Sequence, residues 1–246
     1  MKEIISIITV VKDGMPFLVD CIKSFQKQVY KNKEHIILVS KSSDNTQDYL
    51  KKHKYKNTKI IFYKNKTDLY KSLNTAVRHC KGKIIGYLHS DDIFFNKKTL
   101  NLIANNFSKY DYTYGNVSFI KKNNVSYKIR SWNYGEINTY KIKNFLVPPH
   151  TSMFFKKKIL LNTKYNEAYK ISSDFDFLIR IIKNKKLKGK YINNYICKMR
   201  YGGKSTSLKY SAKKIIEDYT ILRKYNKYPF YLILFKYLVK IKQFSF

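Results

Sequence analysis

Apolar and polar positions alternate in blocks along the first 90 residues, and each block has the period of a strand or a helix. Ile4 to Val11 holds six β-favouring apolar residues in eight positions, which predicts a strand buried on both faces. Leu18, Cys21, Ile22 and Phe25 then follow at helical spacing. The same patterns predict a strand at 35–39, a helix at 46–53, a strand at 59–63, a helix at 69–80 and a strand at 83–89.

This alternation of strand and helix predicts an α/β fold with a parallel, doubly wound sheet. The second half of the chain is less regular. Residues 110–129 predict short antiparallel strands around a turn at Asn123 and Asn124, and residues 152–157 predict another strand. We therefore expect a smaller antiparallel portion beside the parallel sheet.

One domain with a short tail is the expected organisation. Helices are predicted after the "SSD" stretch at 172–174 and over 212–225. The chain has no internal repeat and no clear linker before about Lys227. The sequence therefore predicts one domain over residues 1–226, divided near residue 92, and a separate C-terminal helix over 227–246.

Two adjacent aspartates, Asp91 and Asp92, follow a predicted buried strand that ends at His89. In a doubly wound sheet, ligands bind at the carboxyl ends of the strands, so the loops after Val11, Val39 and this strand should share one rim. Paired carboxylates there can hold a divalent cation, whose charge offsets their repulsion. A turn with solvated aspartates is the alternative, and position alone does not decide between the two.

Asp174 and His150 are two further candidates for chemistry. Asp174 lies in the predicted first turn of a helix, where Ser172 or Ser173 can cap the helix and an aspartate favours its dipole. The alternative is a general base directed into a cleft, and spacing alone favours the capping role. His150 follows two prolines in "VPPH", and a lone histidine is more often structural than a ligand.

The chain is strongly basic, with 50 Lys and Arg against 16 Asp and Glu and a net charge of +34. Such a charge favours anionic partners such as phosphorylated small molecules or an anionic membrane surface, although the Lys-, Asn- and Ile-rich composition expected from an AT-rich genome explains it equally well. Basic residues are spread along the chain, which argues against a nucleic-acid-binding protein. The cysteines, Cys21, Cys80 and Cys197, are far apart and form no Cys-x-x-Cys pair, so neither a zinc site nor a disulfide framework is indicated, and a reducing cytosolic compartment fits best.

The predicted C-terminal helix is apolar nearly all round, and such a helix needs burial. Its apolar positions are Phe230, Leu232, Ile233, Leu234, Phe235, Tyr237, Leu238, Val239 and Ile241. Lys236, Lys240 and Lys242 could stay in a headgroup layer while the aromatic rings enter the interface. Peripheral membrane binding and docking on the protein's own core or a second subunit are equally good interpretations. No apolar run approaches the length of a membrane-spanning helix.

Taken together, the motifs resemble the family 2 glycosyltransferases, which carry the GT-A fold. The resemblance runs over about 220 residues, from "SIITVVKDG" through "GKIIGYLHSDDIF", "PPHTSMFFKK" and "ISSDFDFLIRI" to "YGGKSTS". It is closest to bacterial enzymes that build capsule, exopolysaccharide and lipopolysaccharide sugars. The resemblance implies that residues 1–92 are a nucleotide-binding half and that residues 93–226 form the acceptor side.

The family's metal motif, a DXD-type sequence often written Asp-x-Asp-Asp or Asn-Ser-Asp-Asp, matches "HSDD". The resemblance implies that Asp91 is the main ligand of Mn²⁺ or Mg²⁺, that Asp92 is its neighbour, and that His89 stands where the first Asp often stands. It also implies that Asp174 is the catalytic base. One base and one displacement would invert the anomeric configuration of the sugar taken from a nucleotide-sugar donor.

The resemblance also assigns a donor-binding set. Its members are Thr9, Val11, Val39, Asn74, His89, Asp92 and His150. His150 and the Gly202–Gly203 loop fall near the diphosphate or the acceptor. Two positions depart from the family: Val39 lies where an acidic residue usually reads uracil, and Lys71 replaces an Asp in "KSLN". A UDP-sugar is the favoured donor, but the departures leave base recognition open.

The function implied is a metal-dependent, inverting glycosyltransferase that acts on a glycan or lipid-linked acceptor in surface polysaccharide synthesis. We expect a cytoplasmic protein, on the inner face of the membrane if the tail binds lipid, with a homodimer as the alternative partner for the tail. A catalytically impaired homologue that binds sugar nucleotide or glycan without turnover is the rival function, motivated by Val39 and Lys71. No nucleic-acid partner is expected.

Overall fold

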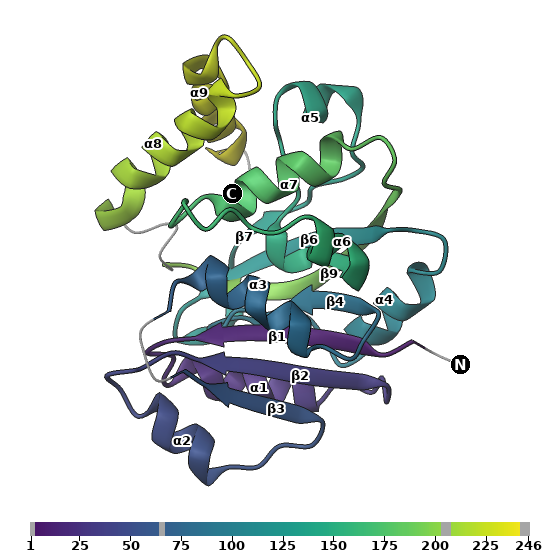
Figure 1. Ribbon diagram of the computed structural model, residues 1–246, viewed down its shortest axis with the longest axis vertical. Coiled ribbons are helices and arrows are strands. Elements are labelled where there is room, and N and C mark those ends of the chain that lie inside the picture. The colour runs from purple at the N-terminus through teal and green to yellow at the C-terminus, as the bar shows by residue number, and fades with distance from the viewer. Residues whose placement is uncertain (1–2, 64–66, 203–207, 242–246) are drawn as a thin grey trace.

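Nine strands form one mixed sheet in the computed structural model, which describes residues 3–63, 67–202 and 208–241. The strands run in the order β3–β2–β1–β4–β8–β6–β9–β5, and β7 pairs with β6 (Figure 1). Their bounds are Ile5–Val11 (β1), Lys33–Val39 (β2), Thr58–Phe62 (β3), Ile84–Tyr87 (β4), Ile93–Phe94 (β5), Tyr112–Lys121 (β6), Asn124–Trp132 (β7), Phe154–Lys156 (β8) and Gly189–Arg200 (β9). The predicted α/β class is confirmed.

The first four strands are parallel, as their apolar runs predict. β1 pairs with β2 and with β4, and β2 pairs with β3. Ile8 of β1 lies opposite Ile36 on one side and Tyr87 on the other. All residues of β1 except Val10 are buried, because helices cover both faces of the sheet.

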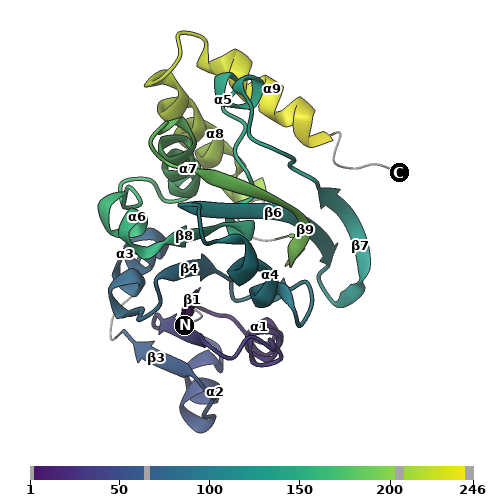
Figure 2. The same cartoon turned by 90° about the vertical axis from the view of Figure 1, so that its right-hand side faces the viewer.

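The helices form a layer on each face of this sheet (Figures 1 and 2). On one face, α1 and α4 pack with Ile5 and Ile7 of β1, and on the other face α3, α6 and α7 pack with Ile8. The bounds are Phe17–Gln26 (α1), Thr46–Lys52 (α2), Leu69–His79 (α3), Thr99–Asn106 (α4), Thr139–Lys143 (α5), His150–Ser152 (a 3₁₀ turn, η1), Lys157–Asn162 (α6), Ser173–Lys183 (α7), Leu208–Arg223 (α8) and Pro229–Ile241 (α9).

The second half of the sheet mixes strand directions. β8 is antiparallel to both β4 and β6, and β7 forms a hairpin with β6 whose turn, at Lys122 and Asn123, lies one residue earlier than predicted. β6 pairs in parallel with β9, which the sequence did not predict. β9 buries only a few apolar side chains, such as Ile192, Ile196 and Cys197, among lysines and asparagines. Its apolar pattern is therefore too weak to identify it as a strand.

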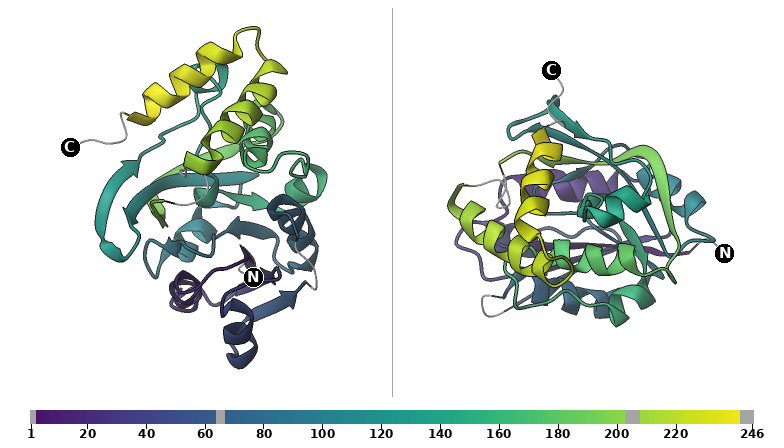
Figure 3. Two further views of the ribbon diagram at one scale, coloured as in Figure 1. Left: turned by 90° about the vertical axis from the view of Figure 1, so that its left-hand side faces the viewer. Right: turned by 90° about the horizontal axis from the view of Figure 1, so that it is seen from above.

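The two C-terminal helices, α8 and α9, lie together at the end of the molecule opposite α2 (Figure 3). α9 buries Leu232 and Ile233 in a cluster with Ile221, Leu222 and Ile179. The helix predicted within 227–246 is therefore present, and one of its faces docks on the protein's own core. None of the helices in the described ranges is long and apolar enough to cross a membrane.

Candidate active site

The rim at the carboxyl ends of β1 and β2 is held together by side-chain bonds between two loops. Asp44 accepts hydrogen bonds from the backbone N–H of Met15, at 2.9 Å, and of Thr46, at 3.0 Å. Asp13 accepts from the N–H of Ser43 at 2.6 Å. The loop after β1 is thus fixed to the loop after β2 through the Asp44 and Asp13 carboxylates.

The turn from His89 to Asp92 follows β4 on the same rim. The N–H of Asp92 donates to the carbonyl oxygen of His89 at 3.0 Å, which closes the turn. The Asp92 carboxyl is buried, and its Oδ1 accepts from the backbone N–H of Arg200 at 3.3 Å. Burial and the charge of Asp91 raise the pKa of Asp92 well above its ordinary value. Asp91 is partly exposed.

Arg200, at the end of β9, fastens this turn. Its guanidinium donates to the carbonyl oxygen of Asp91 at 2.5 Å, to the carbonyl oxygen of Lys122 at 3.0 Å and to Oδ2 of Asp20 at 2.6 Å. The side chain is only 3% exposed and lies over the ring of Phe17. Sequence reasoning missed Arg200 because it missed β9; the only local signal was its place just before the "YGG" stretch.

A divalent cation fits the chemistry of the Asp91–Asp92 pair. Carboxylate oxygens are ligands that Mg²⁺ and Mn²⁺ accept, and Mg²⁺ commonly takes one or two carboxylates and leaves its other positions to water and phosphate. Oδ2 of Asp92 is buried without a hydrogen-bond partner in the described chain, and the partly exposed Asp91 offers the accessible carboxylate. Within the described ranges, no three His, Cys, Asp or Glu side chains lie close enough together to hold a metal ion between them.

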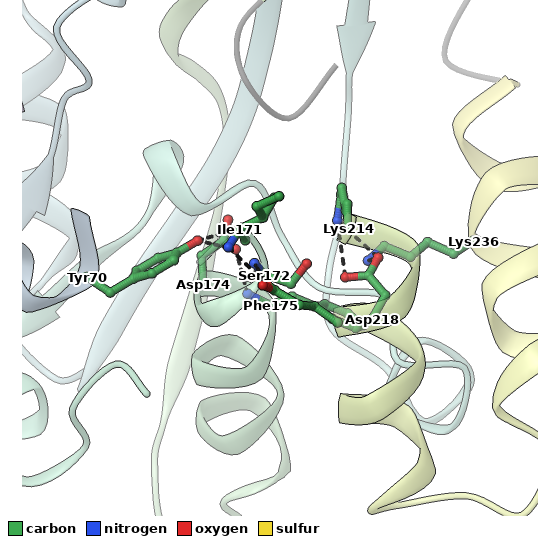
Figure 4. Close-up of polar contacts among 9 residues, drawn as sticks. Tyr70, Ile171, Ser172, Asp174, Phe175, Lys214, Asp218 and Lys236 are labelled. Carbon is green, nitrogen blue, oxygen red and sulfur yellow. Dashed lines mark hydrogen bonds and ion pairs between the residues drawn. The ribbon is translucent and has the colours of Figure 1, made fainter. Parts of the chain in front are cut away.

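Asp174 lies at the start of α7, beside a buried tyrosine from α3 (Figure 4). Its Oδ1 accepts from the N–H of Phe175 at 2.8 Å and lies 3.3 Å from the hydroxyl of Tyr70. That hydroxyl donates to the carbonyl oxygen of Ile171 at 2.5 Å. The N-cap residue is Ser172, but its side chain makes no cap bond. The serine cap predicted there is therefore wrong, and the orientation of Asp174 comes from Tyr70 and the backbone.

His150 lies between the two acidic turns. Its Nε2 is 2.6 Å from the hydroxyl of Tyr165, and its ring stacks on Tyr87 with centroids 4.8 Å apart. The centroid of the His89 ring lies 6.1 Å from that of His150. Burial lowers the pKa of His150 to about 4, although the charge of Asp174 opposes this shift. The imidazole is therefore neutral at pH 7.

The other predicted donor-binding side chains are engaged inside the protein. Thr9 donates to the carbonyl oxygen of Leu88 at 2.7 Å, and Val11 and Val39 pack in one cluster with α1 and α2. The Asn74 amide donates to the carbonyl oxygen of Tyr165 at 3.0 Å and accepts from its N–H at 2.9 Å. Contact of these residues with a nucleotide stays a prediction.

Most of the predicted Gly-Gly loop lies outside the described residues. Gly202 is described, with φ of +101°, whereas residues 203–207 are not.

Comparisons with known proteins agree on one family. Residues 6–170 match the sequence profile described as Glycosyl transferase family 2. The chain is 31% identical over 220 residues to an uncharacterized glycosyltransferase of Methanocaldococcus jannaschii, a match that covers 86% of this chain and 75% of that protein. It is 24% identical over 173 residues to the GalNAc(5)-diNAcBac-PP-undecaprenol beta-1,3-glucosyltransferase of Campylobacter jejuni, which covers 67% and 55% of the two chains.

A solved structure shows the same fold. Residues 1–349 of Staphylococcus aureus TarS, in complex with UDP-GlcNAc, match with a TM-score of 0.68 and 17% identity over 89% of this chain and 65% of TarS 1–349. At this identity the likeness concerns the fold alone. The chain thus spans three quarters of the Methanocaldococcus relative but less than two thirds of the Campylobacter protein and of the TarS chain.

Proposed function

The chain belongs to the family 2 glycosyltransferases, and from that premise we propose that it is a metal-dependent, inverting enzyme. In this proposal it transfers a sugar from a nucleotide-sugar donor, with a UDP-sugar favoured, to a glycan or lipid-linked acceptor in surface polysaccharide synthesis. The complex of TarS with UDP-GlcNAc supports a nucleotide-sugar donor. The Campylobacter relative, a glucosyltransferase named for an undecaprenol-diphosphate-linked glycan, supports a lipid-linked acceptor.

We assign the metal-binding role first to Asp91. Its carboxylate is partly exposed on the rim, whereas the Asp92 carboxyl is buried and bonded to the Arg200 backbone. Asp92 then supports the turn and adds negative potential to the site. Arg200 orients Asp91 through its carbonyl oxygen. A divalent cation bound there would neutralise the donor diphosphate and stabilise it as a leaving group.

We assign the general base to Asp174. As an acceptor hydroxyl attacks the anomeric carbon, the bond from that carbon to the diphosphate breaks, and the nucleoside diphosphate leaves with the electron pair. The hydroxyl proton passes to the carboxylate. A single displacement of this kind inverts the anomeric centre. The observation that carries the assignment is the Asp174 carboxylate, held at the start of α7 by the Phe175 N–H and beside the Tyr70 hydroxyl rather than used in a serine-type cap.

The test is a donor panel of UDP-, GDP- and CMP-sugars, assayed with Mn²⁺ and with Mg²⁺ in the presence of an acceptor extract. We expect Asp174→Asn to keep metal-dependent nucleotide binding and to lower kcat about 10³-fold, because a positioned base contributes on that order. Asp91→Asn should instead remove the metal-dependent part of nucleotide binding. Asp48→Asn, on an exposed face of α2, is the matched control.

Two results would overturn parts of this proposal. Full turnover by Asp174→Asn would rule out its role as base. No turnover by the unaltered protein with any donor would favour the homologue that binds sugar nucleotide or glycan without turnover, the function motivated by Val39 and Lys71.

We also propose that α9 binds an anionic membrane surface. Beside its docked face, α9 exposes the apolar side chains Phe230, Tyr231, Leu234, Leu238 and Ile241. The net charge of +34 adds attraction to anionic lipid. A lipid-linked acceptor would bring the protein to such a surface, on its cytoplasmic side. A second copy of the chain over the same face is the alternative.

Co-sedimentation with phosphatidylglycerol vesicles tests this proposal. We expect the triple substitution Phe230→Ser, Tyr231→Ser and Leu234→Ser to reduce binding at least tenfold, because three exposed apolar side chains no longer enter the interface. These substitutions spare the buried Leu232 and Ile233. Tyr127→Ser, at an exposed site on β7, is the control. Equal vesicle binding by the triple variant would contradict membrane docking. So would a dimer of the unaltered protein in solution that the triple variant no longer forms, because a second copy would then cover this face of α9.

A further inference from the structure

The backbone just before Asp174 donates three hydrogen bonds to one carboxylate. Oε1 of Glu217 accepts from the N–H of Lys170 at 2.9 Å, and Oε2 accepts from the N–H of Ile171 at 2.9 Å and of Ser172 at 2.8 Å. Glu217 comes from α8 and is only 8% exposed. Both oxygens of this carboxylate therefore accept hydrogen bonds from the backbone of residues 170–172, the segment that precedes α7.

The same segment is held from its other side by α3. The Tyr70 hydroxyl donates to the carbonyl oxygen of Ile171, and the Lys170 ammonium pairs at 2.7 Å with Asp68, the residue before α3. Figure 4 shows Tyr70 reaching Ile171 and Asp174 from one side, with the side chains of α8 and α9 on the other. Residues 170–172 are thus clamped between helices that are distant in sequence.

The Glu217 carboxylate also places a negative charge near the start of α7, where no serine side chain caps the helix. A helix N-terminus carries unpaired N–H groups and partial positive charge, and a nearby anion stabilises it. The Ser172 side chain makes no cap bond. Because Glu217 provides the anion from another helix, the Asp174 carboxylate does not have to turn back over the helix end, beyond its contact with the Phe175 N–H.

The next residue of α8, Asp218, ties that helix to the tail. Its carboxylate is 1% exposed and pairs with Lys214 at 3.0 Å and with Lys236 of α9 at 2.9 Å (Figure 4). Burial works to raise the pKa of Asp218, but the two ammonium groups outweigh it and hold the pKa at about 2. The helix that carries Glu217 is therefore anchored to α9 by a buried charge cluster.

We propose that Glu217 is a positioning residue for Asp174: it fixes the turn that directs the carboxylate, and through Asp218 and Lys236 it links the tail helix to that turn. This inference rests on the proposed role of Asp174 as the base. It assigns α8 and α9 a part in the transfer step in addition to packing.

The test compares Glu217→Gln and Glu217→Ala with the unaltered protein at a temperature well below unfolding. An amide can accept through one oxygen only, so we expect kcat to fall about tenfold in Glu217→Gln and about 100-fold in Glu217→Ala, as small misplacements of a reacting group do. The KM for the donor and the affinity for the nucleotide should not change, because Glu217 lies away from the Asp91 turn. Glu136→Gln, an exposed carboxylate on the loop between β7 and α5, should leave kcat unchanged.

A double substitution separates this inference from the proposed function. In the Asp174→Asn background, Glu217→Ala should reduce the residual rate no further, because Glu217 acts through Asp174. An independent further loss would overturn the positioning role, as would an unchanged kcat in a folded Glu217→Gln protein. If Asp174→Asn itself keeps full turnover, the base assignment fails instead. If Glu217→Ala does not fold, Glu217→Gln decides the outcome.

Discussion

Two short turns present the acidic groups of this site, and each is fastened by a charged side chain from far along the chain. The turn at Asp91 and Asp92 is held by a cation, Arg200, whereas the turn before Asp174 is held by an anion, Glu217. Both residues are almost fully buried, at 6% and 8% exposure of the whole residue. The sign of the charge is the main difference between them.

That sign follows from the backbone groups that each turn presents. The turn after β4 offers acceptors: the Asp91 carbonyl oxygen accepts from the Arg200 guanidinium, and the Asp92 carboxyl accepts from the Arg200 backbone N–H. A cation at this place also offsets the negative charge of the turn. The segment before α7 offers three N–H donors at a helix start, so a carboxylate fits there. Each turn can thus be oriented without using the carboxylate proposed for chemistry.

The largest expected effect comes from removing the cation. Arg200→Met should lower the free energy of unfolding by about 3 kcal/mol, since each buried acceptor left without its donor costs about 1 to 3 kcal/mol. It leaves three bonded oxygens without their donor, those of Asp91, Lys122 and Asp20, and removes the compensating charge beside Asp92. Denaturant unfolding measures the change, and metal-dependent nucleotide binding should weaken with it.

Two further variants make this result specific. Arg200→Lys should recover only part of the stability, because an ammonium lacks the planar set of donors. Arg223→Met, at an exposed position on α8, should stay within about 0.5 kcal/mol. A loss below about 1 kcal/mol in Arg200→Met would contradict the fastening role and remove the contrast between the two turns.

Local patterns in the sequence predicted the first half of the fold and both acidic turns. Strands such as β1 and β2 have continuous apolar runs, and short connections leave little choice of partner. Asp91 and Asp174 were found because they stand beside such runs. The α9 helix was also predicted, since its apolar surface is evident from the residues alone.

The groups that orient those aspartates were not predicted. Arg200 contacts Asp91 across 109 residues, and Glu217 contacts Ser172 across 45. Arg200 ends a strand rich in Lys and Asn, and Glu217 is one acidic residue on a helix of mixed polarity. No local sequence pattern at either residue indicates which residue it contacts. These contacts are known only once the structure shows how the distant elements pack.

His150, which lies between the two turns, gives a smaller, pH-dependent effect. Burial lowers its pKa in the folded protein to about 4, against an ordinary value of 6.5. As pH falls, the unfolded chain therefore takes up the proton first. The stability contributed by neutral His150 is complete above pH 6.5 and is lost as pH falls towards 4, by about 2 kcal/mol between pH 6.5 and 5. Denaturant unfolding at pH 7, 6 and 5 measures this loss.

His150→Gln should make that slope shallower. Buried His35, whose pKa is lowered to about 3, contributes in the same direction as His150, whereas buried Asp92, whose pKa is raised, contributes in the opposite direction. An unchanged slope would mean that His150 does not titrate as its burial requires.

Histidine NMR compares the two turns directly. Asp174→Asn should lower the pKa of His150 further, because a stabilising anion is lost, whereas His89→Ala should raise it, because a like charge is removed. Shifts in the opposite directions would show that His150 does not lie between the fields of the two turns.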